Sequence, residues 1–219
     1  MNSDNIGGKD QYVMFDLKVL HPDIWYWENA ISYPDELVGF INDLNSNTLS
    51  HKAISLWEIW SASDNDSVIY GAKKYISSNI DDMTTQDEKI NKKILYIVNS
   101  LKMAYEMCYE RYFDGHSNLN KKEYKIDYGR IPIQKWIVGA SMGPHTDGYD
   151  GHSNLAFSSV LYLNDNYEGG EINFPNHNIK IKPKKGSLII FPSQDPFIHE
   201  VKPVLSGDRY MSALNAWKI

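Results

Sequence analysis

The spacing of apolar residues changes near residue 124, from helical periodicity before it to short strands after it. In the first half, a capping-box pattern at Thr85 and Glu88 precedes apolar residues at helical spacing, namely 90, 94, 97, 98, 101, 104 and 108. Pro34 at the start of another apolar pattern predicts a shorter helix that runs to Leu44. Residues 14–27 and 54–60 are strand-like. We therefore expect two helices and supporting strands in this half of the chain.

After residue 124, Gly, Pro and Asn interrupt short segments rich in β-branched and aromatic residues, which is the pattern of an antiparallel sheet. The predicted strands cover residues 131–138, 155–163, 171–174, 178–181, 187–191, 198–201 and 209–217. Many short strands of this kind are typical of a β-sandwich or jelly roll. We therefore expect a mainly β fold of the α+β class, in which helices support a jelly roll.

The chain of 219 residues contains no internal repeat, no low-complexity segment and no linker long enough to separate two domains. We expect a single domain over residues 1–219. Within it, residues 1–123 would form a helical and strand support region, and residues 124–219 would form the jelly-roll core.

The composition is that of a globular protein, with 42% apolar and 23% charged residues. No apolar run approaches the roughly 20 residues of a membrane span, and the amino terminus lacks the basic and apolar regions of a signal peptide. We therefore expect no membrane partner and a cytoplasmic location.

Charge and cysteine content exclude further classes of protein. Asp and Glu outnumber Lys and Arg by 28 to 22, so the chain lacks the basic surface typical of nucleic-acid binding. Cys108 is the only cysteine, which excludes an internal disulfide and a thiolate zinc cluster and fits a reducing compartment. Because Cys108 lies on the apolar stripe of the longer predicted helix, we expect a buried structural thiol rather than a nucleophile.

Two ligand-type side chains lie at positions i and i+2 in His145-Thr146-Asp147. In an extended chain such residues project from the same face and can converge on one metal ion. His199, on a later predicted strand, offers a third ligand. Two imidazoles and one carboxylate form the facial triad of non-haem Fe(II) sites, which leaves coordination positions open. Arg209, ten residues further on, offers a planar guanidinium fork that can bind a carboxylate.

Other candidate ligands carry less weight than this triad of His145, Asp147 and His199. The His-Pro-Asp sequence at 21–23 repeats the spacing, but we interpret it as a surface turn. The segment HEVKP at 199–203 begins like the helical zinc-protease motif, yet Pro203 replaces the second histidine and is incompatible with a helix interior.

Two further residues, His152 and Asp150, lie in a Gly-flanked turn after the first two ligands. They remain rival ligands.

Six sequence blocks resemble, in their order, the prolyl 4-hydroxylase branch of the 2-oxoglutarate/Fe(II)-dependent dioxygenases. The blocks are GPHTD at 143–147, YLN at 162–164, GGEINF at 169–174, PKKGSLIIFP at 183–192, HEVKPV at 199–204 and GDRY at 207–210. The resemblance covers the carboxy-terminal ninety residues. It implies a distorted double-stranded β-helix, which is a jelly roll with supporting helices and agrees with the strands predicted above.

The resemblance also implies roles for individual residues. The triad would hold Fe(II), and Arg209 would anchor the far carboxylate of the cosubstrate 2-oxoglutarate. Tyr162 matches a family tyrosine that hydrogen-bonds the same carboxylate. Trp136 stands where relatives often have a tyrosine that touches the cosubstrate, and its indole N–H could donate there instead.

The activity implied is hydroxylation of an unactivated C–H bond, with dioxygen and 2-oxoglutarate as cosubstrates, release of succinate and CO2, and ascorbate as reductant. Peptidyl proline is the substrate that the resemblance favours. The alternatives are a dioxygenase for a free amino acid or another small molecule, and a noncatalytic jelly-roll module that retains the metal pocket. The acidic charge argues against nucleic-acid demethylation. The sequence leaves the oligomeric state open.

A loop over the site is a further expectation. Residues 61–70 begin with a polar segment that directly follows an aromatic stretch bearing Trp57 and Trp60. We expect this segment to cover the substrate, with an exposed hairpin tip away from the metal as the alternative.

Overall fold

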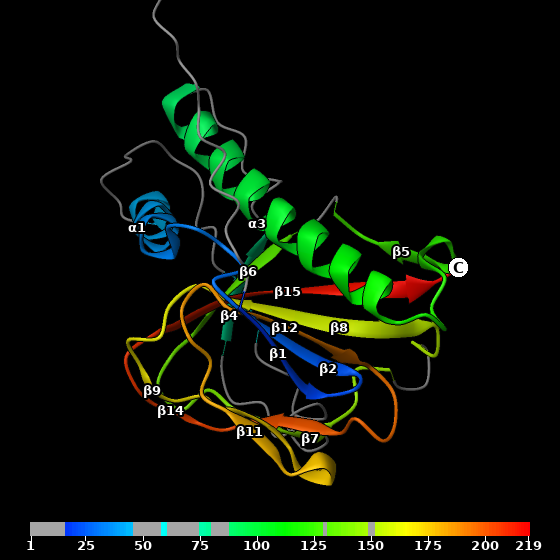
Figure 1. Ribbon diagram of the computed structural model, residues 1–219. Coiled ribbons are helices and arrows are strands. Elements are labelled where there is room, and N and C mark those ends of the chain that lie inside the picture. The colour runs from blue at the N-terminus through cyan, green and yellow to red at the C-terminus, as the bar shows by residue number, and fades with distance from the viewer. Residues whose placement is uncertain (1–15, 46–57, 61–74, 80–87, 129–130, 149–151) are drawn as a thin grey trace, which may run out of the picture.

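The computed structural model describes residues 16–45, 58–60, 75–79, 88–128, 131–148 and 152–219. Within these residues, two sheets face each other and a long helix lies across the larger one (Figure 1). The helices are α1 (Pro34–Asn45) and α3 (Glu88–Gly115), with short 3-10 turns at Lys121–Glu123 and Pro175–His177.

Nine of the described strands form the larger sheet. Their order in space is β1 (Asp16–His21), β2 (Ile24–Glu28), β12 (Leu188–Pro192), β8 (Leu155–Tyr162), β15 (Arg209–Lys218), β6 (Pro132–Trp136), β4 (Tyr75–Asn79) and β3 (Glu58–Trp60), with β5 (Tyr124–Ile126) paired to β15. The smaller sheet has the order β11 (Ile179–Ile181), β10 (Ile172–Phe174), β13 (His199–Val201) and β7 (Met142–His145). A two-stranded sheet joins β14 (Val204–Ser206) to β9 (Glu168–Gly169), and all these pairings are antiparallel.

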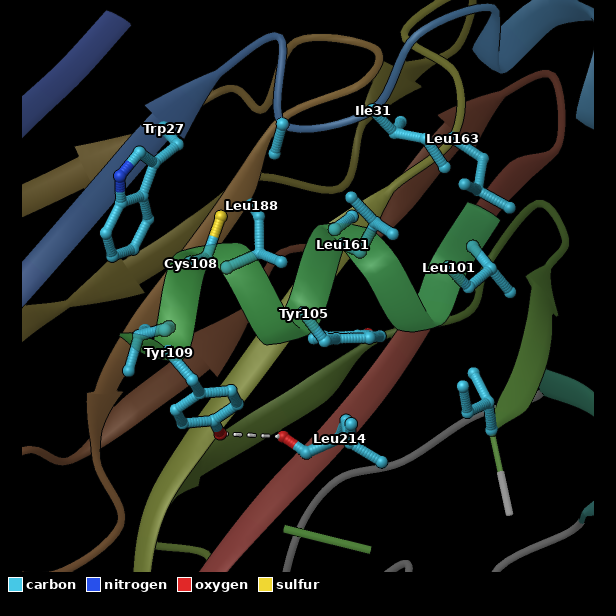
Figure 2. Close-up of a cluster of buried hydrophobic side chains, with 14 of the residues drawn as sticks. Trp27, Ile31, Leu101, Tyr105, Cys108, Tyr109, Leu161, Leu163, Leu188 and Leu214 are labelled. Atoms are coloured by element: carbon cyan, nitrogen blue, oxygen red, sulfur yellow. Dashed lines mark hydrogen bonds between the residues drawn. The ribbon is translucent and has the colours of Figure 1, made fainter. Parts of the chain in front are cut away.

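The central strands of the larger sheet supply side chains to two separate cores, because successive residues of a strand point to opposite faces. On the outer face, Leu161, Leu188 and Leu214 pack against α3. Figure 2 shows Leu101, Tyr105 and Cys108 of α3 over this face, with the Tyr109 hydroxyl donating to the Leu214 carbonyl at 3.3 Å. The helix therefore covers one side of the sheet.

The inner face of the same strands points toward the smaller sheet. Tyr162, Ile189 and Met211 belong to a second cluster that also contains Ile172 and Phe174 of β10. This arrangement of two facing antiparallel sheets confirms the predicted jelly roll with supporting helices.

The seven strands predicted after residue 124 are all present, with ends that differ by a few residues. The strand-like segment 14–27 is two strands rather than one, because a turn at Pro22 and Asp23 reverses the chain between β1 and β2. The region predicted as support contributes to the larger sheet, since β2 pairs with β12 and β4 pairs with β6.

Some predictions fall on residues that the structure does not describe. Of the predicted strand 54–60, only β3 is described. The predicted loop at 61–70 lies outside the described residues, as does the proposed helix cap at Thr85. Among the helices that are described, none has the length and apolar character needed to cross a membrane.

The Cys108 thiol should be unreactive toward thiol reagents in the folded protein. Its side chain is fully buried on α3, and burial raises the pKa of the thiol far above its usual range. Because Cys108 is the only cysteine, a thiol reagent such as Ellman's reagent reports on it alone. We expect native protein to react at least about a hundredfold more slowly than protein unfolded in guanidinium, since reaction requires opening of the core. Equal rates in the two states would contradict this packing.

Candidate metal centre

The three predicted ligands meet between the two sheets. His145 ends β7 and His199 begins β13, and these two residues lie opposite each other in the antiparallel pair. The Asp147 carboxylate oxygens lie 3.3 Å from His145 Nε2 and 3.6 Å from His199 Nε2. Neighbouring ligands of an octahedral ion with bonds of about 2.1 Å lie about 3 Å apart. The triad therefore needs only small movements to bind one metal ion, and its potential ligand atoms all lie within 4.8 Å of one another.

The backbone fixes the protonation pattern of both imidazoles. Nδ1 of His145 lies 2.8 Å from the Gly143 carbonyl oxygen, and Nδ1 of His199 lies 3.3 Å from the Phe197 carbonyl oxygen. A carbonyl oxygen can only accept, so each Nδ1–H donates, and in the neutral imidazole Nε2 then holds the lone pair. This is the tautomer that a metal ion requires, and Nε2 is the atom that faces Asp147 in both rings.

The charges of the triad also suit a cation. Burial raises the pKa of Asp147, but the imidazoles of His199 and His145 outweigh burial and hold the pKa of this carboxyl well below its usual range. Burial lowers the pKa of His199 to about 4. Burial also acts to lower the pKa of His145, but its pairing with Asp147 outweighs burial and raises it. At neutral pH the site therefore combines an ionised carboxylate with a neutral His199, the forms that bind metals.

One pocket connects the triad to Arg209. It has a volume of about 160 Å³, well above the roughly 10–15 Å³ that a cavity needs on the same measure to hold one water molecule. Its walls include Tyr162, Met211 and Val160 of the larger sheet in addition to the triad and Arg209. The pocket thus has room for a small molecule between a metal site and a cation.

Arg209 lies on the inner face at the start of β15, where its side chain is only 1% exposed. Its Nε and Nη1 find no hydrogen-bond partner within the described part of the chain. Leaving charged donors buried and unpaired is costly, so such a guanidinium is expected to have an anionic partner. A dicarboxylate that reaches from the metal to Arg209 fits this requirement.

Tyr162 and Trp136 flank Arg209, as two aromatic walls of the pocket. The guanidinium carbon lies 4.8 Å from the Trp136 ring centroid and 5.1 Å from that of Tyr162. The Tyr162 hydroxyl is buried next to Arg209 and makes no hydrogen bond of normal geometry to a described residue, so it can bind a carboxylate oxygen. The Trp136 indole N–H instead donates to Gln134 Oε1 at 2.9 Å. A contact between Trp136 and a cosubstrate therefore involves its ring rather than this N–H.

Asn164 fixes the position of Arg209, a role that the YLN motif did not predict. Its Nδ2 donates to the Asp208 carbonyl oxygen at 2.7 Å, and its Oδ1 accepts from the Tyr210 backbone N–H at 2.7 Å. These two bonds hold the residues on either side of Arg209. Tyr167 was also missed: it is buried beside Arg209, and the guanidinium counteracts the effect of burial on its pKa.

The rival ligands lie elsewhere or outside the described residues. The His152 ring packs against Trp217, with ring centroids 5.6 Å apart, and takes no part in the triad. The His21 ring packs against the His177 ring, with centroids 4.6 Å apart, and its Nδ1 accepts a hydrogen bond from the Asp23 backbone N–H. Asp150 is not described.

Comparison with known proteins supports the resemblance. Residues 132–217 match the family model of the 2OG-Fe(II) oxygenase superfamily. A PKHD-type hydroxylase of Prochlorococcus marinus (strain NATL1A) is 39% identical over 80 residues, which cover 34% of this chain and 35% of that protein. Prolyl 3-hydroxylase 2 of Homo sapiens is 43% identical over 63 residues, which cover 26% of this chain and 9% of that protein. The matches thus span about a third or less of these relatives.

Solved structures extend the likeness to most of the chain. A prolyl hydroxylase from Trichoplax adhaerens, in complex with a hypoxia inducible factor peptide fragment, has a TM-score of 0.62 and 18% identity over 91% of this chain and 86% of that one. Viral collagen prolyl hydroxylase from Paramecium Bursaria Chlorella virus-1, in a 2OG complex, has a TM-score of 0.54 and 19% identity over 90% of this chain and 96% of that one. At this identity the likeness shows the fold. The predicted resemblance to prolyl hydroxylase-like oxygenases is therefore confirmed.

Metal binding should require the whole triad. Replacing His145, Asp147 or His199 with alanine removes a ligand, so we expect Fe(II) affinity, measured anaerobically by equilibrium dialysis, to fall at least about a hundredfold in each variant. His152→Ala is the matched control, because it removes an imidazole that lies outside the triad. Native affinity in His145→Ala, or loss of iron in His21→Ala instead, would show that the ligands are wrongly assigned.

Proposed function

We propose that this chain, which resembles the 2OG-Fe(II) oxygenase superfamily over residues 132–217, is an iron(II)- and 2-oxoglutarate-dependent dioxygenase of the prolyl 4-hydroxylase-like type. The observation that carries the proposal is a pocket that joins a triad of two histidines and an aspartate to a buried guanidinium, two of whose nitrogen atoms have no hydrogen-bond partner among the described residues. A metal-binding module without cosubstrate would have no need of that guanidinium. The noncatalytic alternative is therefore disfavoured.

Each group in the pocket has a defined task in this proposal. Bound Fe(II) and 2-oxoglutarate would supply the chemistry that hydroxylates an unactivated C–H bond with dioxygen and yields succinate and CO2. His145, Asp147 and His199 would occupy one face of the metal and leave the other face to the cosubstrates. Arg209 and the Tyr162 hydroxyl would bind the far carboxylate and orient the molecule toward the metal. Ascorbate is the reductant we expect to support repeated turnover.

Apolar side chains also surround His199 and part of the pocket. Phe191 packs edge-on against the His199 ring with centroids 4.7 Å apart, and Phe174 lies next to both rings. Val160 and Met211 line the pocket between the triad and Arg209. These apolar side chains shield His199 from water and would strengthen electrostatic interactions around it.

Peptidyl proline is the substrate we propose. Several proteins that resemble this chain are named prolyl hydroxylases, and one of the solved structures contains a peptide fragment. The PKHD-type relatives carry only the general name hydroxylase, so a free amino acid or another small molecule is the second candidate.

Arg209 should determine the requirement for 2-oxoglutarate. In Arg209→Lys a point charge replaces the two-pronged guanidinium, and we expect the 2-oxoglutarate concentration for half-maximal succinate release to rise about tenfold. Arg209→Ala should raise it further. Arg111→Ala is the control, because Arg111 is an exposed cation on α3, on the other face of the larger sheet. An unchanged requirement in both Arg209 variants would refute the role of this residue.

The substrate class can be tested by substrate-stimulated succinate release. We expect proline-containing peptides to stimulate release, with one oxygen atom incorporated into the peptide as detected by mass spectrometry. Free amino acids and methylated oligonucleotides serve as comparison substrates. Stimulation by free amino acids alone would replace peptidyl proline with the second candidate, whereas stimulation by oligonucleotides would contradict the argument from charge.

A further inference from the structure

Asp147 differs from the two histidine ligands in how it is held. His145 and His199 lie in paired strands, and their side chains are 7% and 6% exposed. Asp147 follows the end of β7, and its side chain is 30% exposed. The terminal torsion of an aspartate side chain is broad, so backbone position alone does not orient the carboxylate. Other groups must fix its orientation if the metal site is preformed.

Ser158 lies beside this carboxylate on the inner face of the larger sheet. Its place on β8 is set by register, because it pairs with Phe191 of β12 and Asn215 of β15. It is 3% exposed and lines the same pocket as Asp147. Its hydroxyl is one of the groups that help to lower the pKa of the Asp147 carboxyl.

Ser193 links Ser158 to the backbone next to Asp147. The two serine Oγ atoms lie 2.7 Å apart, and Ser193 is fully buried. The Ser193 carbonyl oxygen also accepts from the Gly148 backbone N–H at 2.9 Å, while its own N–H donates to the Ala156 carbonyl oxygen at 2.9 Å. Ser193 therefore holds both the residue after Asp147 and the hydroxyl of Ser158, which lines the same pocket as Asp147.

We propose that Ser158 and Ser193 form a positioning pair that orients the Asp147 carboxylate for metal binding. An ionised carboxylate only accepts hydrogen bonds, so in this arrangement Ser158 would donate to Asp147 and use its oxygen as an acceptor. The Ser193 hydroxyl then donates to Ser158, which gives the chain of hydrogen bonds one direction. Hydrogen bonds in such a chain polarise one another, so the first bond depends on the second. The inference rests on the proposed function, since it concerns a ligand of the proposed metal.

Two buried hydroxyls could instead only satisfy each other and stabilise the fold. The two roles differ in what they affect. A purely structural pair affects thermal stability and leaves metal affinity unchanged, whereas a positioning pair affects the affinity for Fe(II) and the visible absorption of the anaerobic protein with Fe(II) and 2-oxoglutarate.

Ser158→Ala, Ser158→Thr and Ser193→Ala test the proposal, with Ser159→Ala as the matched control. Ser159 is the next residue of β8 and equally buried, but its hydroxyl accepts from Tyr109 of α3 on the opposite face. We expect Ser158→Ala to lower Fe(II) affinity about tenfold, as changes behind a metal ligand typically do, and to shift the visible absorption. Ser193→Ala should act in the same direction, and Ser158→Thr, which keeps the hydroxyl, should restore affinity to within about threefold. Ser159→Ala should lower the thermal midpoint without changing Fe(II) affinity.

Native Fe(II) affinity and absorption in Ser158→Ala would overturn the positioning role while leaving the proposed function intact. An equal loss of affinity in Ser159→Ala would overturn it as well, because the effect would then follow from general destabilisation. Failure of the unaltered protein to bind Fe(II) would instead contradict the proposed function itself, and the inference would fall with it.

Discussion

In the smaller sheet, His199 of β13 lies directly opposite His145 of β7, and the geometry of the candidate metal centre depends on this pairing. Each histidine is two residues after the carbonyl that binds its Nδ1, so both rings present Nε2 to the same point. A shift of one residue in this register would turn one imidazole to the other face of the sheet. The triad is thus a consequence of strand pairing, with Asp147 as the one ligand that strand pairing does not fix.

The larger sheet supplies the other end of the pocket. Arg209 of β15 and Tyr162 of β8 lie on its inner face, because successive side chains of these strands point alternately to the two cores. Facing sheets pack about 10 Å apart, a separation that suits a small molecule bridging the two. Asn164 then fixes the backbone on both sides of Arg209. Each sheet therefore contributes one half of the proposed cosubstrate site, and α3 stabilises the larger sheet from behind.

Local sequence patterns predicted the elements that have strong local signals. Periodicity was sufficient for α3 and for β8, β12 and β15, whose residues are buried on both faces of the sheet. It failed for β7, where Gly143 and Pro144 have low strand propensity and the strand forms because β13 pairs with it. The pairing of β2 with β12 joins residues about 160 positions apart, which no local pattern encodes.

From the sequence, only those residues of the candidate site could be predicted whose side chains are specialised for binding a metal ion or a carboxylate. His145, Asp147, His199 and Arg209 have functional groups that few other residues can replace. Ser158 and Ser193 have no such signature, because two serines 35 residues apart become a pair only when β8 and β12 are aligned. The role of Asn164 is likewise visible only from the backbone atoms that it binds. Supporting residues of a site are therefore the part that needs a structure.

Thermodynamic coupling between metal and cosubstrate would show whether the pocket between the two sheets binds a metal ion and 2-oxoglutarate together. Calorimetric titration of 2-oxoglutarate would be carried out with and without Mn(II), a redox-stable substitute for Fe(II), and repeated with glutarate, which keeps both carboxylates but lacks the keto group. We expect Mn(II) to tighten 2-oxoglutarate binding by at least about tenfold and 2-oxoglutarate to tighten Mn(II) binding by the same factor, with little coupling for glutarate. Equal 2-oxoglutarate affinity with and without the metal would contradict joint binding in this pocket.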